Sequence, residues 1–114
     1  MITAIQMEPE EDRFRLRITS DRPMEFAHFM LREPQRIIID PVSTVFSQVH
    51  EFMKAEGDLV KSIRLIPAYA EVPKELGPDT KSVDFLIIAL RRPCRYEAEE
   101  QGTTVVVTIQ PLKP

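Results

Sequence analysis

Hydrophobic and polar residues alternate along most of this chain, in short runs that prolines and glycines separate. The clearest run is "RFRLRIT" (13–19), in which Phe14, Leu16 and Ile18 fall on one face and three arginines on the other. A period of two is that of a half-buried β-strand. Runs rich in β-branched and aromatic residues predict further strands at 2–7, 24–31, 36–40, 60–66, 83–90, 94–99 and 103–109.

Turn residues indicate how some of these strands connect. "SDRP" (20–23) predicts a turn after the strand at 13–19, so the run at 24–31 is interpreted as a returning strand. Gly102 marks the turn of a closing hairpin. The stretch 67–82 contains three prolines and is expected to be a long loop.

One segment has a different period. In "PVSTVFSQVHEFMKAEG" (41–57) the apolar residues recur at spacings of three and four, which predicts an amphipathic helix at about 41–56. Asp40 is then suited to be its N-cap, with Pro41 as the first helical residue and Gly57 just past the end. A capping role for Asp40 needs no catalytic explanation.

The predicted strands and helix together indicate the fold class. The runs at 36–40 and 83–90 are apolar on both faces, so both faces require cover. We therefore predict a mainly β chain: a β-sandwich of short antiparallel strands with one inserted amphipathic helix lying outside its central strands. Residues 1–110 are expected to form one domain, with 111–114 as a tail or linker, because 114 residues suffice for a single core.

Charge and hydropathy narrow the function classes. The formal net charge of −3 argues against nucleic acid as a partner. No apolar run approaches the roughly 20 residues needed to span a bilayer, so direct membrane insertion is not expected. The opening residues do not have the pattern of a signal peptide, which suggests a cytoplasmic protein or a domain of a longer chain. Cys94 is the only cysteine, which excludes an internal disulfide.

Residues suited to catalysis are sparse. His28 and His50 have no metal-ligand spacing; His28 is interpreted as a packed strand residue with one hydrogen bond, and His50 as solvated. Two arginines before Cys94 could lower its thiol pKa, although a small buried strand residue is the preferred interpretation. The acidic stretches 8–12 and 97–100 are interpreted as solvated turn carboxylates. We expect no catalytic residue, no metal site and no cofactor.

The arginines are more informative, because they outnumber the lysines ten to five and several lie on predicted strands. Arg13, Arg15 and Arg17 lie about 6.7 Å apart along one strand face. The preferred interpretation of this arginine ladder is a solvated face paired with acids on a neighbouring strand.

Arg36 and Arg64 each lie within an otherwise apolar segment. The planar guanidinium binds carboxylates through two parallel hydrogen bonds. These two arginines therefore serve either a carboxylate ligand or an internal partner such as Asp40 or Asp84. The sequence leaves both alternatives open.

At these residues the chain resembles a family. "EPQRIIID" (33–40) resembles the Pro-x-Arg-aliphatic-aliphatic-aliphatic-Asp signature of AMIN domains, non-catalytic modules of bacterial cell-envelope proteins. "FRLRITSDRPMEFAHFML" is similar to the family's first hairpin, "VKSIRLI" to its Val-x-x-Ile-Arg strand, and "YEAEEQGTTVVVTIQP" to its closing hairpin. The predicted helix at 41–56 resembles an insertion in this pattern.

The resemblance implies a β-sandwich of the kind found in peptidoglycan amidases and in the outer-membrane secretins of type IV pilus systems. It implies a targeting module that binds peptidoglycan in the periplasm or cell envelope, as part of a longer secreted chain. Arg36 and Arg64 match the family's recurrent arginines and are the first candidate binding residues, followed by the arginine ladder.

Three function classes remain open. A peptidoglycan-binding module requires a strand face that mixes arginine with aromatic or aliphatic surface. A protein-interaction domain of an envelope or pilus assembly would use sheet edges or the apolar helix face. An enzyme would need a pocket converging on His28, Cys94 or the turn acids.

Overall fold

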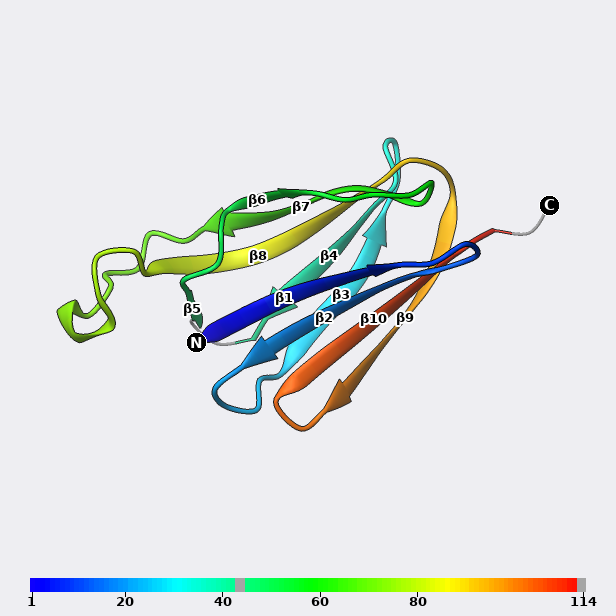
Figure 1. Cartoon of the computed structure of the whole chain (residues 1–114). Helices are drawn as coiled ribbons and strands as arrows, with labels where there is room; N and C mark the ends of the chain where they lie inside the picture. The colour runs from blue at the N-terminus through cyan, green and yellow to red at the C-terminus, as the bar shows by residue number, and fades with distance from the viewer. Residues whose placement is uncertain (43–44, 113–114) are drawn as a thin grey trace.

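The computed structural model describes residues 1–42 and 45–112, and within these residues the chain forms ten β-strands (Figure 1). In chain order the strands are β1 (Ile2–Pro9), β2 (Phe14–Ser20), β3 (Phe26–Leu31), β4 (Arg36–Pro41), β5 (Val45–Ser47), β6 (Phe52–Lys54), β7 (Val60–Pro67), β8 (Lys81–Leu90), β9 (Cys94–Gln101) and β10 (Thr104–Pro111). The only helical segment of the described part is a 3₁₀ turn, η1 (Lys74–Leu76). The prediction of a mainly β chain is confirmed.

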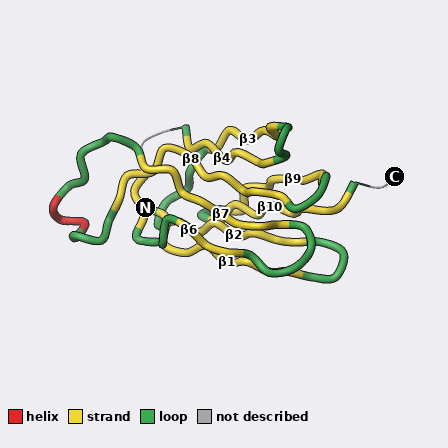
Figure 2. The backbone as a smooth tube through the Cα atoms, turned by 90° about the horizontal axis from the view of Figure 1, so that it is seen from above, coloured by secondary structure: helices red, strands yellow, loops and turns green. Residues whose placement is uncertain are grey.

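The strands form one continuous sheet that curls over on itself. Its order is β3-β4-β8-β5-β1-β2-β10-β9, and β7 pairs with β8 and with β6. Figure 2 shows β3 and β4 on one side of the molecule and β1 and β2 on the other. The short strand β5 joins the two halves, because it pairs with β8 antiparallel and with β1 through a parallel pair, Ile2 and Ser47. The result is a nearly closed barrel rather than two separate sheets.

The predicted strand pairings are confirmed at the C-terminal end and wrong at the N-terminal end. β9 and β10 form the closing hairpin around Gly102, whose φ is +65°. β3, however, does not return along β2: it pairs with β4, while both edges of β2 are occupied by β1 and β10. The turn after Ser20 therefore carries the chain across to the other half of the sheet.

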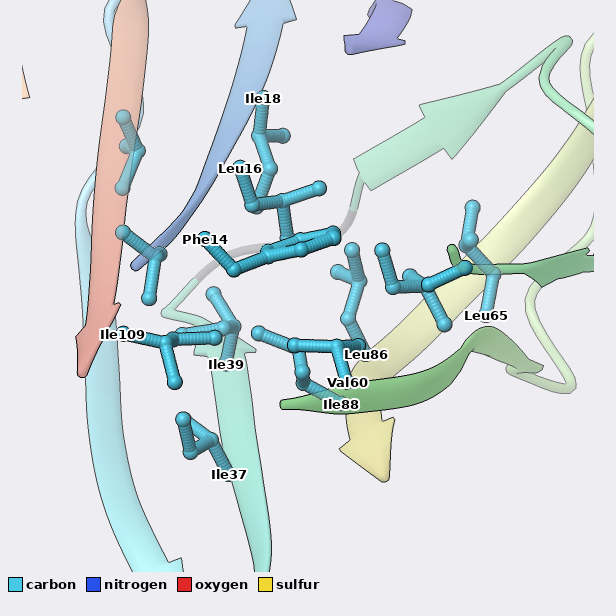
Figure 3. Packing of buried hydrophobic residues seen from close by; sticks show 14 of the residues in the cluster. Phe14, Leu16, Ile18, Ile37, Ile39, Val60, Leu65, Leu86, Ile88 and Ile109 are labelled. Atoms are coloured by element: carbon cyan, nitrogen blue, oxygen red, sulfur yellow. The ribbon is translucent and has the colours of Figure 1, made fainter. Parts of the chain in front are cut away.

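The core lies between the two halves of the sheet (Figure 3). Phe14, Leu16 and Ile18 of β2 point into it, and each is at most 1% exposed. Ile37 and Ile39 of β4 meet them from the opposite half and are fully buried. The rest of the core comes mainly from inward-facing residues of β7, β8 and β10, among them Val60, Ile63, Leu86, Ile88, Val107 and Ile109. The apolar faces that the alternating sequence predicts are thus buried against each other in the two halves of the sheet.

The predicted helix at 41–56 is wrong. This stretch forms β5 and β6 with a connecting loop; Ser43 and Thr44 lie outside the described residues. Val45, Val49 and Met53 contact the core at four-residue spacing because a loop separates two short strands. β-branched valines lower helix propensity, and strand pairing with β7 and β8 is available instead.

The residues assigned to the helix ends have other positions. Asp40 lies in β4 and caps no helix, and Pro41 is the last residue of the same strand. Gly57, with φ of +96°, lies in the turn between β6 and β7, where a left-handed conformation favours glycine.

The two remaining segments are the long loop and the C-terminal end. The loop at 67–80 projects from the body at the left of Figure 1. Ser82 Oγ anchors its start by donating to the carbonyls of Ala68 and Ala70 at 2.9 and 3.2 Å. Pro111, at the start of the predicted tail, still pairs with Cys94 in the last strand, and residues 113–114 lie outside the described part.

Candidate functional site

The outward face of β3, β4, β8, β7 and β6 carries arginine beside aromatic and aliphatic side chains. Ile37 of β4 is paired with Ile88, and Ile88 with Ile63; all three point into the core. Since neighbours along a strand alternate, the rows on either side of this one point outward. One row is Leu31, Arg36, Ala89, Ser62 and Lys54, and the other is Phe29, Ile38, Ile87, Arg64 and Phe52. We call the residues of these two rows the arginine–aromatic face.

The aromatic residues at both ends of this face are open to solvent. Phe29 is 44% and Phe52 is 45% exposed. The guanidinium carbon of Arg64 lies 5.2 Å from the centroid of the Phe52 ring, a cation–π contact that orients the arginine across the sheet. Between them Ile38 is only 5% exposed although it points away from the core cluster. The face is therefore partly apolar, with a positioned cation.

A cleft of about 650 Å³ lies over the β6, β7 and β8 part of the face. Four cationic side chains line it, and none of the described residues that line it is acidic; the set is Phe52, Lys54, Ala55, Lys61, Ser62, Arg64, Ile87, Ala89 and Arg91. Within the described residues, no carboxylate lies within ion-pair distance of these four cations. On a chain of net negative charge, the cleft is a local positive site suited to an anion.

Arg36 is held on the same face by its own turn. Its guanidinium donates to the carbonyl of Pro34 at 2.7 Å, and in the described structure it forms no ion pair with Asp40. Arg64 likewise has no ion pair with Asp84 there. From strand spacing, the Cα atoms of Arg36 and Arg64 lie about 12 Å apart. Within the described residues, neither arginine therefore has the internal partner, Asp40 or Asp84, that the sequence offered as an alternative to a ligand. Both guanidinium groups can still contact one extended ligand.

The arginine ladder lies on the other half of the sheet, and Arg13 and Arg17 form ion pairs with glutamates. Arg17 Nε donates to Glu8 at 2.6 Å, and Arg13 Nε to Glu10 at 2.5 Å. The hydrogen bond from Arg13 holds the pKa of Glu10 below its ordinary value. Arg15 lies opposite Glu8 in the strand register, but the Glu8 carboxylate is bonded to Arg17. The ladder thus matches the solvated-face interpretation.

The residues considered for catalysis do not come together. His28 is exposed rather than packed, and makes its one hydrogen bond, of 2.9 Å, with the hydroxyl of Tyr96. Cys94 is 3% exposed, and burial raises the pKa of its thiol more than nearby Arg92 lowers it. That direction is opposite to the one a reactive thiolate needs. His50 is exposed, as expected, but in a loop.

The two acidic stretches also lie in different elements of the structure. Residues 97–100 lie within β9 rather than in a turn, whereas residues 8–12 span the end of β1 and the turn after it. In the part of the chain that the structure describes, no group of three or more histidine, cysteine or acidic side chains is arranged to hold a metal ion.

Of the two arginines selected from the sequence, Arg64 lines the cleft, whereas Arg36 lies on β4, elsewhere on the arginine–aromatic face. The other charged residues of the cleft were not expected from the sequence. Lys54 and Phe52 were assigned to a helix, which hid their place on a strand beside Arg64. Lys61 follows Val60 at an irregularity in the β7–β8 pairing, so simple alternation does not assign its side. Arg91 lies just beyond β8, where only tertiary structure brings it to the cleft.

Comparison with known proteins adds no family to these observations. Neither a protein-family model nor a curated protein sequence matches the chain. Across residues 1–42 and 45–112, no helix has the length and apolar character needed to cross a membrane.

Proposed function

We propose that this chain is a non-catalytic cell-envelope module that binds peptidoglycan through the arginine–aromatic face and localises a larger periplasmic protein. The observation that carries the proposal is the cleft beside Phe52, with four cations and no carboxylate among its described lining residues. Resemblance of "EPQRIIID" to the AMIN signature is a second, independent support, because it includes Arg36.

The chemistry of peptidoglycan suits this face. Its stem peptides carry carboxylates, which the guanidinium forks of Arg36 and Arg64 bind through paired hydrogen bonds. Lys54, Lys61 and Arg91 line the same cleft as Arg64 and add positive potential there. At physiological salt this potential is screened over a Debye length of about 8 Å, so it acts on a ligand inside the cleft. The exposed ring of Phe52 offers an apolar surface for a sugar or an alanine methyl. Attraction is local, because the net charge of −3 gives none at long range.

Sedimentation with purified peptidoglycan sacculi tests this function. The variant Arg36→Lys with Arg64→Lys keeps both charges but removes both planar forks. We expect the affinity for sacculi to weaken by at least about a hundredfold, since each arginine loses one hydrogen bond and hydrogen bonds to charged groups contribute about 1.5–3 kcal/mol each. The melting temperature should change little, because neither arginine has an ion-pair partner within the described residues.

Matched controls separate a site from general charge. Arg13→Lys with Arg17→Lys makes the same chemical change on the opposite half of the sheet and should leave binding intact. Sacculi whose stem carboxylates have been amidated should lose the wild-type protein. If both double variants bind like wild type, the arginine–aromatic face is not the site. If the Arg36 and Arg64 variant instead loses stability while binding per folded molecule is unchanged, these arginines brace the fold.

A protein-interaction domain in a type IV pilus or secretin assembly is the second candidate. It is favoured by the projecting loop, in which the side chain of Tyr69 is fully exposed. Wild-type protein that does not sediment with sacculi, while remaining folded, would favour this candidate over the first.

A further inference from the structure

The curled sheet does not close into a complete barrel, and the opening is lined by apolar and acidic residues. β3 and β9 are the two ends of the strand order, so within residues 1–42 and 45–112 each has one edge without a strand partner. They nevertheless lie near each other: the ring centroids of His28 on β3 and Tyr96 on β9 are 5.5 Å apart, edge to face. We call the space between these two strands the seam.

Toward the C-terminal end of β9 the seam widens into a cleft of about 340 Å³. Its floor is apolar and includes the core residues Ile39 and Val105. One rim is formed by Phe26 and His28 of β3, and the other by Ala98, Glu99 and Glu100 of β9. A segment that enters here meets an unpaired strand edge, an apolar floor and an acidic rim at once.

Two kinds of group on the β9 rim, backbone amides and carboxylates, have no partner among the residues that the structure describes. In an edge strand, half of the backbone N–H and C=O groups point away from the single neighbouring strand, and here that neighbour is β10. The side chains of Glu99 and Glu100 also have no cation within 4 Å in the described structure. Glu97 adds a third acid to the same strand, while Arg95 lies at its other end. Glu97 and Glu99 share the outward face of β9, and Glu100, opposite the core residue Val105, lies on the inward face.

These charges determine what can pair with the edge. A second copy of this chain that paired antiparallel at the cleft residues 98–100 would place Glu99 opposite Glu99, and like charges directly opposite are destabilising. A strand carrying lysine or arginine between apolar residues meets the opposite condition. Its basic side chains lie on the outward face beside Glu97 and Glu99, while its apolar side chains lie on the inward face with Ile39 and Val105.

We propose that the seam binds an extended basic segment of a partner protein, which adds as a strand to the free edge of β9. The main-chain hydrogen bonds supply affinity, and the glutamates select basic sequences. This interaction surface is separate from the arginine–aromatic face and does not depend on the proposed binding of peptidoglycan.

An end-blocked eight-residue peptide of alternating lysine and valine is a direct probe, titrated into ¹⁵N-labelled protein. We expect saturable shifts of β9 and β3 amides, and slowed hydrogen exchange of the β9 amides that face the seam. The same peptide with glutamate in place of lysine should not bind. A lysine–valine peptide N-methylated at alternate residues keeps its charge but loses N–H donors, and should bind at least tenfold more weakly.

Protein variants of equal charge complete the test. Glu99→Gln with Glu100→Gln removes two charges at the seam, whereas Glu71→Gln with Glu75→Gln removes two charges in the projecting loop. The seam variant should weaken the lysine–valine peptide about three- to tenfold, in line with exposed ion pairs, and the loop variant less than twofold. No saturable binding, equal effects of the two variants, undiminished binding of the N-methylated peptide, or protection away from β9 would overturn the proposal.

Discussion

Replacing Ile37 and Ile38 by alanine, one at a time, tests which side of β4 faces solvent. The two residues are neighbours in one strand and are 0% and 5% exposed. Ile37 belongs to the core, whereas Ile38 points outward beside Phe29 and Ile87. The sidedness of Arg36 and of the whole arginine–aromatic face depends on this register, because a shift of one residue reverses every side chain.

The expected costs differ because only one of the substitutions leaves an enclosed cavity. Each removes three carbon atoms, and burial contributes about 0.8 kcal/mol per methylene, so the transfer part is about 2 kcal/mol for either residue. At Ile37 the surrounding core cannot collapse fully, and the cavity raises the total cost to about 4 kcal/mol. At Ile38 the solvent-exposed ring of Phe29 can move over the gap, and the cost stays near 2 kcal/mol.

Urea unfolding measures the difference. With a slope of about 1.5 kcal/mol/M, the midpoint should fall by roughly 2.7 M for Ile37→Ala and 1.3 M for Ile38→Ala, with the slope unchanged. Equal losses in the two variants would mean that Ile38 is enclosed as Ile37 is. A larger loss at Ile38 would place Arg36 and Ile38 toward the core and remove the basis for a binding site on this face.

Three further outcomes are expected. Burial raises the pKa of the Cys94 thiol above its ordinary 9.0, so the stability that the neutral thiol contributes is fully present below that pH and is lost as the pH rises through the folded-state pKa. Plotted against pH, the free energies of unfolding of wild type and Cys94→Ala should diverge only in the alkaline range, and parallel curves would contradict this. Gly102→Ala should cost about 1 kcal/mol by thermal unfolding, because its φ of +65° is unfavourable for alanine although a Cβ would meet no atom within 4 Å; an unchanged melting temperature would mean that the turn has another conformation. Cell-wall fragments incubated with the chain, with or without zinc, should release no peptide or sugar above background, and any release would argue for an enzyme.

The sequence alone determined most of the strands, since each signal is local. In the stretch 13–19 every second residue is apolar, and the same residues fill the core in the structure. A strand of this kind needs no knowledge of its partner to be recognised, because alternation follows from the backbone geometry of the strand itself. The glycine at position 102 acts in the same local way on the last hairpin.

Partner choice was decided only by tertiary structure. β3 follows β2 after a turn yet pairs with β4, because the edges of β2 are occupied by β1 and by β10, a strand more than 80 residues later in the chain. The helix predicted at 41–56 failed for the same reason. Apolar residues spaced four apart are compatible both with one face of a helix and with two short strands joined by a loop. Only the pairing of these strands with β7 and β8 distinguishes the two structures.

The candidate sites divide along the same line. Arg36 and Arg64 could be selected from sequence because a charged residue inside an apolar run is a local anomaly. Lys54, Lys61 and Arg91 are ordinary surface residues in the sequence and become a site only when three strands bring them around one cleft. The seam is less visible still, because a free edge is defined by the strand that is absent beside it, and that depends on how the whole sheet curls.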